Sequence, residues 1–293
     1  MFRLHVGNRR VATCLVVAAC MSIVLFSAHN TPKWPLAQIQ QYLGKDLVIP
    51  ASVLQGETKV GQARETPQKY FHESTFDAHY DARFGVQSVS QEQRRLHLRA
   101  LTQAYLSTMN NIGIETWLMH GSLLGWHWNR KVLPWDHDLD VQVSLQGMRH
   151  LVDYHNTTFP AVEPFVARDR HRYLLDINSN RVNADTADGG NKIDARFVDT
   201  MIGLYADITV LHSDNRAAAQ RNKRVMMCKD GQRYNYEDIF PLQTTEFEGV
   251  AAKVPSSSAS VLTKEYGVGS LNNTVYGNHR FDADLGEWAY KST

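Results

Sequence analysis

Two aspartates separated by one residue stand in the most informative stretch of the sequence. Asp138 and Asp140 alternate with Leu139 and Val141, which is the periodicity of a strand with one apolar face. Side chains two residues apart on a strand point the same way and sit roughly 6.6 Å apart. Their charges repel each other, and a divalent cation usually offsets this, with Mg²⁺ or Mn²⁺ preferred by carboxylate oxygens. The pattern predicts a metal site, although a solvated polar strand face gives the same alternation.

Two further aspartates extend this acidic group. Asp136 has the same parity as the pair if the strand begins early. Asp207 lies in residues 204–210, where apolar side chains occupy the alternate positions and leave the aspartate on the other face. A local hydrogen bond is the alternative role for Asp207. The predicted catalytic carboxylates are Asp138, Asp140 and Asp207, and the predicted metal ligands are Asp136, Asp138 and Asp140.

A small-residue turn lies upstream of the acidic strand. His120-Gly121-Ser122 follows a predicted strand and precedes an apolar stretch, so its bare backbone N–H groups can face a phosphate. Followed by an Asp-x-Asp strand, the turn matches the spacing of the nucleotidyltransferase fold, in which the turn binds phosphate and the carboxylates bind its metal. Arg130 could offset phosphate charge, although exposed basic residues are usually only solvated.

The surrounding elements indicate an α+β domain. A capping box at Ser90 and Gln93 opens a helical pattern that Gly113 ends. Helices and strands mix without a regular βαβ rhythm, so we expect a mixed sheet with flanking helices. The predicted strands cover residues 115–119, 139–143 and 172–177 and a hairpin of residues 193–198 and 204–211.

The composition and the N-terminus indicate the class and compartment of the protein. The chain has 293 residues and a net charge of +1, so no strong field favours nucleic acid, which we do not expect as a partner. Residues 11–28 carry no charge and would span roughly 27 Å as a helix, enough to cross a bilayer core. Arginines in residues 1–10 predict a cytosolic tail and a lumenal remainder, in a single-pass type II arrangement. A cleaved signal peptide is the alternative.

The proline-containing residues 29–87 are predicted to form a stem and an irregular lead-in, and residues 88–293 the catalytic domain.

Three blocks of the sequence resemble the LicD/fukutin family of phosphotransferases, and fungal members in particular, which resemble factors for mannosylphosphate addition to cell-surface glycans. The first block is His120-Gly-Ser-Leu-Leu-Gly-Trp126 with Pro134-Trp-Asp-His-Asp-Leu-Asp-Val141; the second is residues 193–200 with 203–209; the third is residues 237–242, 245–249, 253–255 and 264–267.

The resemblance implies a nucleotidyltransferase-like fold and metal-dependent transfer of a phosphorylated group from a nucleotide diphosphate-linked donor to a glycan. The group would be a sugar phosphate, an alditol phosphate or phosphocholine, and the cofactor Mg²⁺ or Mn²⁺. By position, Asp138 and Asp140 would bind the metal and Asp207 would be the third acidic residue. The substrate contacts would be His120, Gly121, Ser122, Arg130, Trp135, Asp194 and Arg196.

The expected location is a Golgi or other secretory-pathway membrane, with the anchor in the bilayer and partners that include other transferases. Two alternatives remain open. One is a non-catalytic regulatory or glycan-binding subunit of another Golgi transferase, and the other is a phosphodiesterase that uses the same metal.

Overall fold

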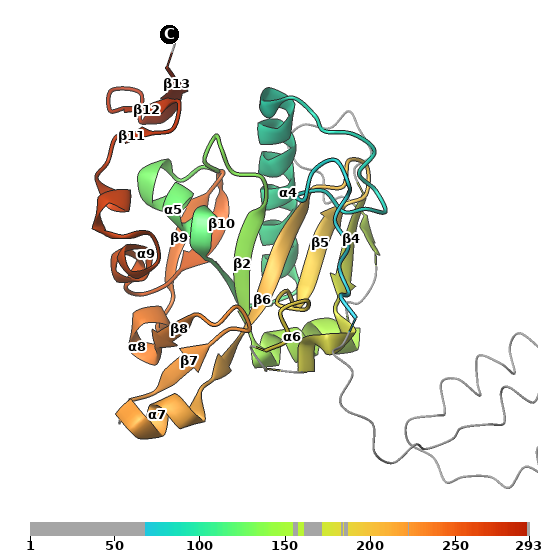
Figure 1. Ribbon diagram of the computed structural model, residues 1–293, viewed down its shortest axis with the longest axis vertical. Coiled ribbons are helices and arrows are strands. Elements are labelled where there is room, and N and C mark those ends of the chain that lie inside the picture. The colour runs from blue at the N-terminus through green and yellow to red at the C-terminus, as the bar shows by residue number, and fades with distance from the viewer. Residues whose placement is uncertain are drawn as a thin grey trace, which may run out of the picture. The chain divides into compact units, whose positions relative to one another are not determined.

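A mixed β-sheet forms the centre of the structure (Figure 1). Its strands are β1 (Thr116–Leu118), β2 (Leu139–Ser144), β3 (Thr158–Pro160), β4 (Arg172–Ile177), β5 (Ala195–Asp199), β6 (Tyr205–Ser213), β7 (Val225–Met227) and β8 (Arg233–Asn235). The order is β1-β2-β6-β5-β4-β3, and β7 pairs with β6 and β8. Among the described strands of this sheet, β2 and β6 form a parallel pair, and the other neighbouring strands pair antiparallel. The predicted α+β class and mixed sheet are confirmed.

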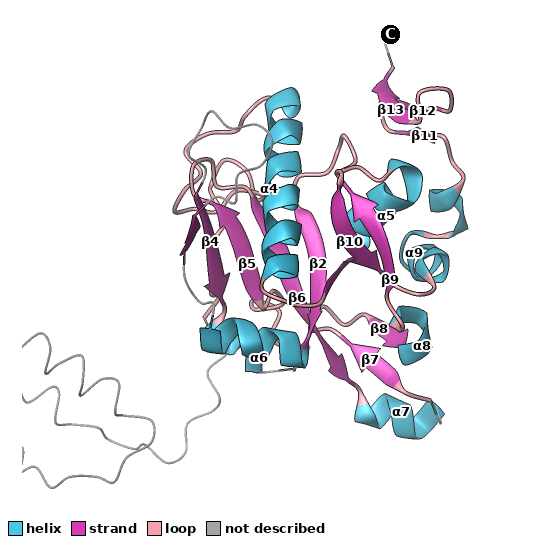
Figure 2. Cartoon of the chain, turned by 180° about the vertical axis from the view of Figure 1, so that it is seen from behind, coloured by secondary structure: helices cyan, strands magenta, loops and turns pink. Residues whose placement is uncertain are grey.

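Helices and two small sheets surround these strands. The helices are α4 (Gln91–Asn111), α5 (His120–Asn129), α6 (Leu145–Tyr154), α7 (Asn215–Arg221), α8 (Tyr236–Ile239) and α9 (Ser258–Tyr266), with 3₁₀ turns η1 (Ser179–Val182) and η2 (Val268–Leu271). The small sheets comprise β9 (Gln243–Phe247) with β10 (Val250–Val254), and β11 (Val275–Tyr276), β12 (His279–Asp282) and β13 (Glu287–Tyr290). Figure 2 shows α4 lying across the sheet near β5 and β6, while α5 packs against α9.

The computed structural model describes residues 68–154, 158–160, 172–182, 184, 187–221 and 223–291. The predicted cytosolic tail, membrane anchor and most of the stem lie outside these residues. Within them, no helix combines the length and the apolar character that crossing a bilayer requires. The described residues belong to one unit that begins at residue 64.

Helix α4 begins where the capping box predicts it. The Ser90 hydroxyl accepts a hydrogen bond from the Gln93 backbone N–H at 3.2 Å, and the Gln93 side chain accepts one from the Ser90 N–H at 3.3 Å. The helix buries Leu98, Leu101 and Tyr105 against the sheet. Each such leucine contributes about 1.5–3 kcal/mol of burial free energy. This packing fixes the sheet that presents the aspartates.

Residues 68–87, which the sequence places in the lead-in, pack against the sheet. Tyr80 is fully buried, and the Asp81 backbone N–H donates to the Gly203 carbonyl at 2.8 Å. Gly203 has φ +86°, and a Cβ there would lie 2.5 Å from the backbone nitrogen of Gly85. The close approach of these two backbones therefore requires glycine. It brings the lead-in beside the β5–β6 hairpin, whose turn the sequence places correctly.

The second glycine of the first sequence block is fixed by packing. A Cβ on Gly125 would lie 2.4 Å from the carbonyl oxygen of Lys131. Helix propensity favours alanine over glycine by about 1 kcal/mol, but this contact is with backbone and cannot move aside cheaply. We expect Gly125→Ala to lower the free energy of unfolding by about 1–3 kcal/mol, measured by chemical denaturation.

The matched control is Gly147→Ala in α6. The nearest atom to a Cβ on Gly147 is the Ser144 hydroxyl at 3.4 Å, which is an ordinary contact. This substitution should be neutral or stabilising by up to about 1 kcal/mol. Equal effects of the two substitutions would contradict the packing explanation.

Candidate active site

Three neighbouring strands bring acidic and basic side chains to one place. Asp140 on β2 is the register partner of Asp207 on the parallel strand β6. Asp207 is in turn the partner of Arg196 on the antiparallel strand β5. Register partners on adjacent strands lie about 5 Å apart and project to the same face. Asp138 directly precedes β2, so the structure brings together the three predicted catalytic carboxylates.

The pKa values of these carboxylates show that they interact. Burial and the charge of Asp138 raise the pKa of Asp140 well above its usual range. Burial also raises the pKa of Asp138, against the nearby charges of His79, Arg196 and His120. Burial raises the pKa of Asp207 to about 6, although Arg196 opposes the shift. The carboxylates thus share a poorly solvated environment in which the nearby positive charges do not fully offset the negative ones.

The fourth predicted acidic residue, Asp136, lies beside the first turn of α5. A Cβ on Gly121 would lie 3.0 Å from Asp136 Oδ2, so this glycine leaves room for the carboxylate. Asp136 Oδ2 is buried and has no hydrogen-bond partner among the residues that the structure describes. Burial, with the charge of Asp138, raises the pKa of Asp136 to about 7. A phosphate at this turn would lie close to this carboxylate, so its approach requires that a proton or a cation neutralise the carboxylate.

The donor set suits a magnesium-type ion that also binds substrate. Among the described residues, no group of three or more His, Cys, Asp or Glu side chains is arranged to hold a metal ion. Mg²⁺, however, is usually bound by one or two carboxylates together with substrate phosphates and waters. Asp138, Asp140 and the unpartnered oxygen of Asp136 supply such carboxylates. The residues present therefore fit a cation that arrives with a phosphorylated substrate.

Ser122 has a structural contact that its sequence does not predict. Its hydroxyl is buried and accepts a hydrogen bond from the Asp140 backbone N–H at 2.9 Å. Helix α5 already begins at His120, so the predicted turn is the first turn of this helix. The bond ties the start of α5 to the acidic strand. The predicted phosphate contact of this segment would then be made by its backbone.

His120 contributes a positive charge next to the acidic centre. Its Nδ1 lies 2.5 Å from Glu265 Oε1, and its Nε2 lies 3.6 Å from Asp230 Oδ2. Burial opposes the charged form, but the hydrogen bond with Glu265 and the charges of Asp140, Glu265 and Asp230 raise the pKa of His120 to about 9. His120 is therefore an imidazolium near neutral pH.

This shift gives a pH-dependent prediction for His120→Asn. Asparagine tolerates the φ of +48° at this position. Because folding raises the pKa, the stabilising contribution of the histidine is complete below its unfolded pKa of about 6.5. It is lost as the pH rises through about 9. The difference in melting temperature between wild type and variant should be large at pH 6 and small at pH 10.

The exposed residue His72 provides the control for this series. His72→Asn should give nearly the same melting temperature as wild type throughout. A His120→Asn difference that is constant with pH would contradict the assignment of a raised pKa.

Arg196 holds Asp207 in a fixed position. Its Nε donates to Asp207 Oδ1 at 2.7 Å, and its Nη2 donates to Glu73 Oε1 at 3.1 Å. The guanidinium carbon lies 3.8 Å from the ring centroid of Tyr205 and 4.8 Å from that of Phe71. Nη1 is buried, and no described residue hydrogen-bonds to it. The predicted substrate contact Arg196 is thus at the acidic centre, with one donor unused.

Three other predicted contacts lie in different surroundings. Arg130 lies at the C-terminal end of α5, stacked on Trp126 at 3.9 Å, roughly 14 Å along the helix from Gly121. Trp135 packs against Trp288 with ring centroids 4.9 Å apart, next in sequence to Asp136. Asp194 is fully buried and ion-paired with Lys229 at 2.8 Å. The structure therefore places Trp135 next to Asp136 in the chain and Arg130 at the other end of α5, and it holds Asp194 in an ion pair with Lys229.

Sequence reasoning missed Glu73, Asp230 and Glu265. Glu73 lies in the segment interpreted as an irregular lead-in, and nothing in its pattern marks it. Glu265 belongs to the third sequence block, which is the one signal that could have identified it. These residues reach the site only through tertiary packing.

Comparison with known proteins identifies a family and two relatives that the sequence resembles. The family described as LicD/FKTN/FKRP, nucleotidyltransferase domain, matches residues 113–257. The chain is 29% identical over 198 residues to Mannosyltransferase regulator 4 of Saccharomyces cerevisiae (strain ATCC 204508 / S288c), covering 64% of this chain and 15% of that protein. It is 32% identical over 175 residues to Mannosyltransferase regulator 14 of the same strain, covering 56% of this chain and 18% of that protein. The chain thus spans less than a fifth of either relative.

Proposed function

Since the chain belongs to the LicD family through a segment that contains the acidic centre, we propose that it modifies glycans by phosphoryl transfer. The donor would be a nucleotide diphosphate-linked sugar, alditol or choline, and the acceptor a glycan hydroxyl, in a mannosylphosphate-type modification. The observation that carries this proposal is the pairing of Asp140 with Asp207 beside Asp138. Such a cluster requires a compensating cation or a cation-bound substrate.

A divalent cation, Mg²⁺ or Mn²⁺, would neutralise the charge of the donor diphosphate when bound. Asp138, Asp140 and Asp136 are the residues that would hold it. Arg196 positions Asp207 through the 2.7 Å hydrogen bond, and its unused Nη1 is suited to a phosphate oxygen. His120 offsets part of the negative charge near Asp140.

Asp207 is the best placed base for the acceptor. With a pKa of about 6 it is mostly ionised at pH 7 and near the value that suits proton transfer. The acceptor oxygen would attack the donor phosphorus while its proton passes to Asp207. The bond from phosphorus to the leaving nucleoside monophosphate breaks as the new one forms, in line with the attack.

A panel of donors tests the proposal directly. GDP-mannose, CDP-ribitol and CDP-choline would each be added with Mn²⁺, and the melting temperature of the chain would be recorded. We expect one of them to stabilise the protein and to release nucleoside monophosphate when a mannan acceptor is added. Absence of both effects for every donor, in protein that melts cooperatively, would reject an enzymatic role.

A regulatory role is the second candidate, and it is favoured by the printed names of the two yeast relatives. In that case the domain would bind a partner transferase and raise its activity without turnover of its own. Co-purification with a transferase, together with no nucleoside monophosphate release by the isolated chain, would support it. Release of nucleotide from donor alone, without acceptor, would instead support a phosphodiesterase.

The location is part of the same proposal. Residues 11–28 would anchor the protein in a Golgi or other secretory-pathway membrane, with the acidic centre in the lumen. Protection of the C-terminal part from protease in sealed microsomes, and its loss on adding detergent, is the expected result.

A further inference from the structure

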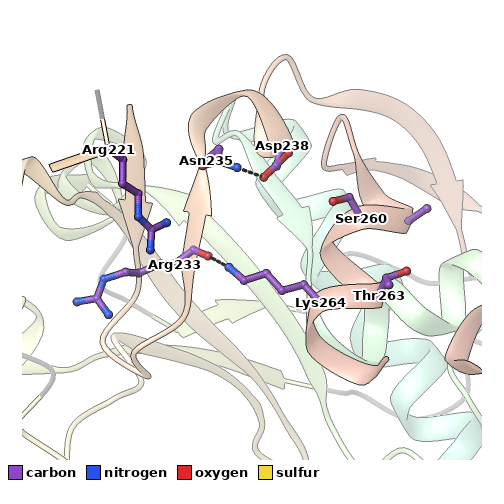
Figure 3. Close-up of a pocket in the computed structure, with 8 residues that line it drawn as sticks. Arg221, Arg233, Asn235, Asp238, Ser260, Thr263 and Lys264 are labelled. Atoms are coloured by element: carbon purple, nitrogen blue, oxygen red, sulfur yellow. Dashed lines mark hydrogen bonds between the residues drawn. The ribbon is translucent and has the colours of Figure 1, made fainter. Parts of the chain in front are cut away.

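A cavity of about 610 Å³ lies on the far side of α9 from His120. It is lined by the last residue of α7, by β8 and the start of α8, and by one face of α9 (Figure 3). We refer to it as the α7–α9 cavity. Ser260, Thr263 and Lys264 face it at helical spacing, whereas Glu265 on the same helix bonds to His120. The helix therefore separates this cavity from the acidic centre.

Three basic side chains and one carboxylate, that of Asp238, line the cavity, so the basic charges are in excess. Arg221 has no hydrogen-bond or ion-pair partner among the described residues. Lys264 donates to the carbonyl oxygen of Arg233, which does not neutralise its charge. Arg233 is paired with Asp214 at 2.8 Å through Nε, which leaves the other guanidinium nitrogens without a partner among the described residues. Asp238 offsets one positive charge of the lining, but neither Arg221 nor Lys264 forms an ion pair with a described carboxylate, and a dianionic group would complement these two side chains.

The hydroxyls of Ser260 and Thr263, the amide of Asn235 and the carboxylate of Asp238 line the rest of the cavity. The hydroxyls of Ser260 and Thr263 have no partner among the described residues. Asn235 donates to Asp238 Oδ2 at 2.8 Å, as the dashed line in Figure 3 shows. Together they offer both donors and acceptors to a ligand that carries several hydroxyl groups.

The size and the lining narrow the class of ligand. A volume of about 610 Å³ is in the range of pockets for ligands much larger than an inorganic ion. No aromatic ring lines the cavity among the described residues, so it lacks a surface on which a nucleobase would stack. Its one apolar side chain, Ala259, is too small to receive an acyl chain. A phosphate attached to a sugar fits these features best.

We propose that the α7–α9 cavity binds a phosphate-bearing saccharide, in which Arg221 and Lys264 bind the phosphate and the α9 hydroxyls bind the sugar. The assignment of this saccharide as part of the acceptor glycan rests on the proposed function. The existence of the binding site does not rest on the proposed function, because the cavity lies apart from the carboxylates and its ligand can bind without a nucleotide-linked donor.

The test is isothermal titration of the full-length chain with mannose 6-phosphate, without nucleotide or metal. We expect binding that weakens as salt is raised, since exposed charges are screened. Arg221→Ala and Lys264→Ala should each raise Kd by about tenfold or more, as expected for a charge-assisted hydrogen bond. The control Arg280→Ala removes an exposed basic residue on β12, outside the cavity, and should leave Kd unchanged.

Comparator ligands separate this proposal from others. Mannose should bind much more weakly, and so should inorganic phosphate. Equal binding of inorganic phosphate, or unchanged affinity in the Arg221 and Lys264 variants, would overturn the proposal. A third outcome would also overturn the proposal. In it, the chain binds phosphatidylcholine vesicles that contain phosphatidylinositol 4-phosphate, the cavity variants lose this binding, and mannose 6-phosphate does not compete with the vesicles. The ligand would then be a membrane surface.

The Asp140→Asn variant distinguishes this proposal from the proposed enzymatic function. It should bind mannose 6-phosphate as wild type does. If donor turnover proves absent while the cavity variants still lose binding, the phosphoryl-transfer proposal fails and the saccharide site stands. If turnover is normal but the cavity variants bind as wild type does, only the saccharide site is wrong.

Discussion

Asp140→Ala is expected to reduce metal-dependent release of nucleoside monophosphate by at least about a hundredfold, the size of the loss when one group that stabilises transition-state charge is removed. Asp140 lies between Asp138, which precedes it on the same segment, and Asp207, its partner on β6. Asp140 is thus the predicted cation ligand that lies next to the predicted base, Asp207. The measurement is single-turnover release with Mn²⁺ and the donor that gives the largest melting shift.

The same variant should remain folded. Burial and the charge of Asp138 raise the pKa of Asp140, so its charged form is disfavoured in the native state. Removing the carboxylate relieves repulsion, and the melting temperature without metal should be unchanged or higher. Asp284→Ala, at an exposed position, is the control for both measurements. Release by Asp140→Ala at the rate of wild type would show that the proposed mechanism is wrong.

Local patterns of the sequence predicted the elements that carry the site. The capping box at Ser90 and the alternation around Asp140 depend on neighbours within a few residues, and both are confirmed. The alternation was incomplete in one respect. Gln142, on the polar face of β2, is fully buried, and its hydrogen bonds with Trp117 and Cys228 satisfy its amide there. A period of two shows which residues share a face but not what covers it.

The features that no local pattern could predict depend on distant segments. The parallel pairing that places Asp140 opposite Asp207 joins residues 67 positions apart, and no local pattern encodes this register. Glu73 and Glu265 reach Arg196 and His120 in the same way. His120 illustrates the consequence, since its predicted phosphate contact says nothing of the two acidic neighbours, Glu265 and Asp230, that raise its pKa.

Lys229 is the clearest case of a residue that sequence reasoning could not place. Lysine is rarely fully buried unless it is paired, yet this side chain has no exposed surface. Its Nζ lies 2.8 Å from Asp194 Oδ1 and donates to the backbone carbonyl of Asn180 at 2.8 Å. Asp194 also accepts from the Val210 backbone N–H at 2.8 Å. The pair joins the segment after β7 to the start of β5, and through Val210 to β6. It accounts for an aspartate that the resemblance suggested as a substrate contact.

Lys229→Met should therefore lower the free energy of unfolding by about 3–5 kcal/mol, because it leaves Asp194 charged and unpaired in the interior. For a domain of this size the loss corresponds to a melting temperature lower by roughly 10 °C. The double variant Lys229→Met/Asp194→Asn removes both charges and keeps a hydrogen-bond acceptor for Val210. It should recover most of the loss, which thermal and urea unfolding at pH 7.5 would measure.

The pH dependence of the single variant separates charge from packing. Burial already raises the pKa of Asp194, and Lys229 is the main opposing influence. Without Lys229 the pKa rises further, so the native state binds a proton more tightly than the unfolded chain does, and stability falls as the pH rises from the unfolded pKa toward the native one. The deficit of Lys229→Met should thus be smaller at pH 5 than at pH 8. The control Lys253→Met breaks the exposed pair with Glu115 and should cost less than about 1 kcal/mol at either pH. A Lys229→Met deficit independent of pH, and retained in the double variant, would mean that lost packing rather than the stranded charge destabilises the domain.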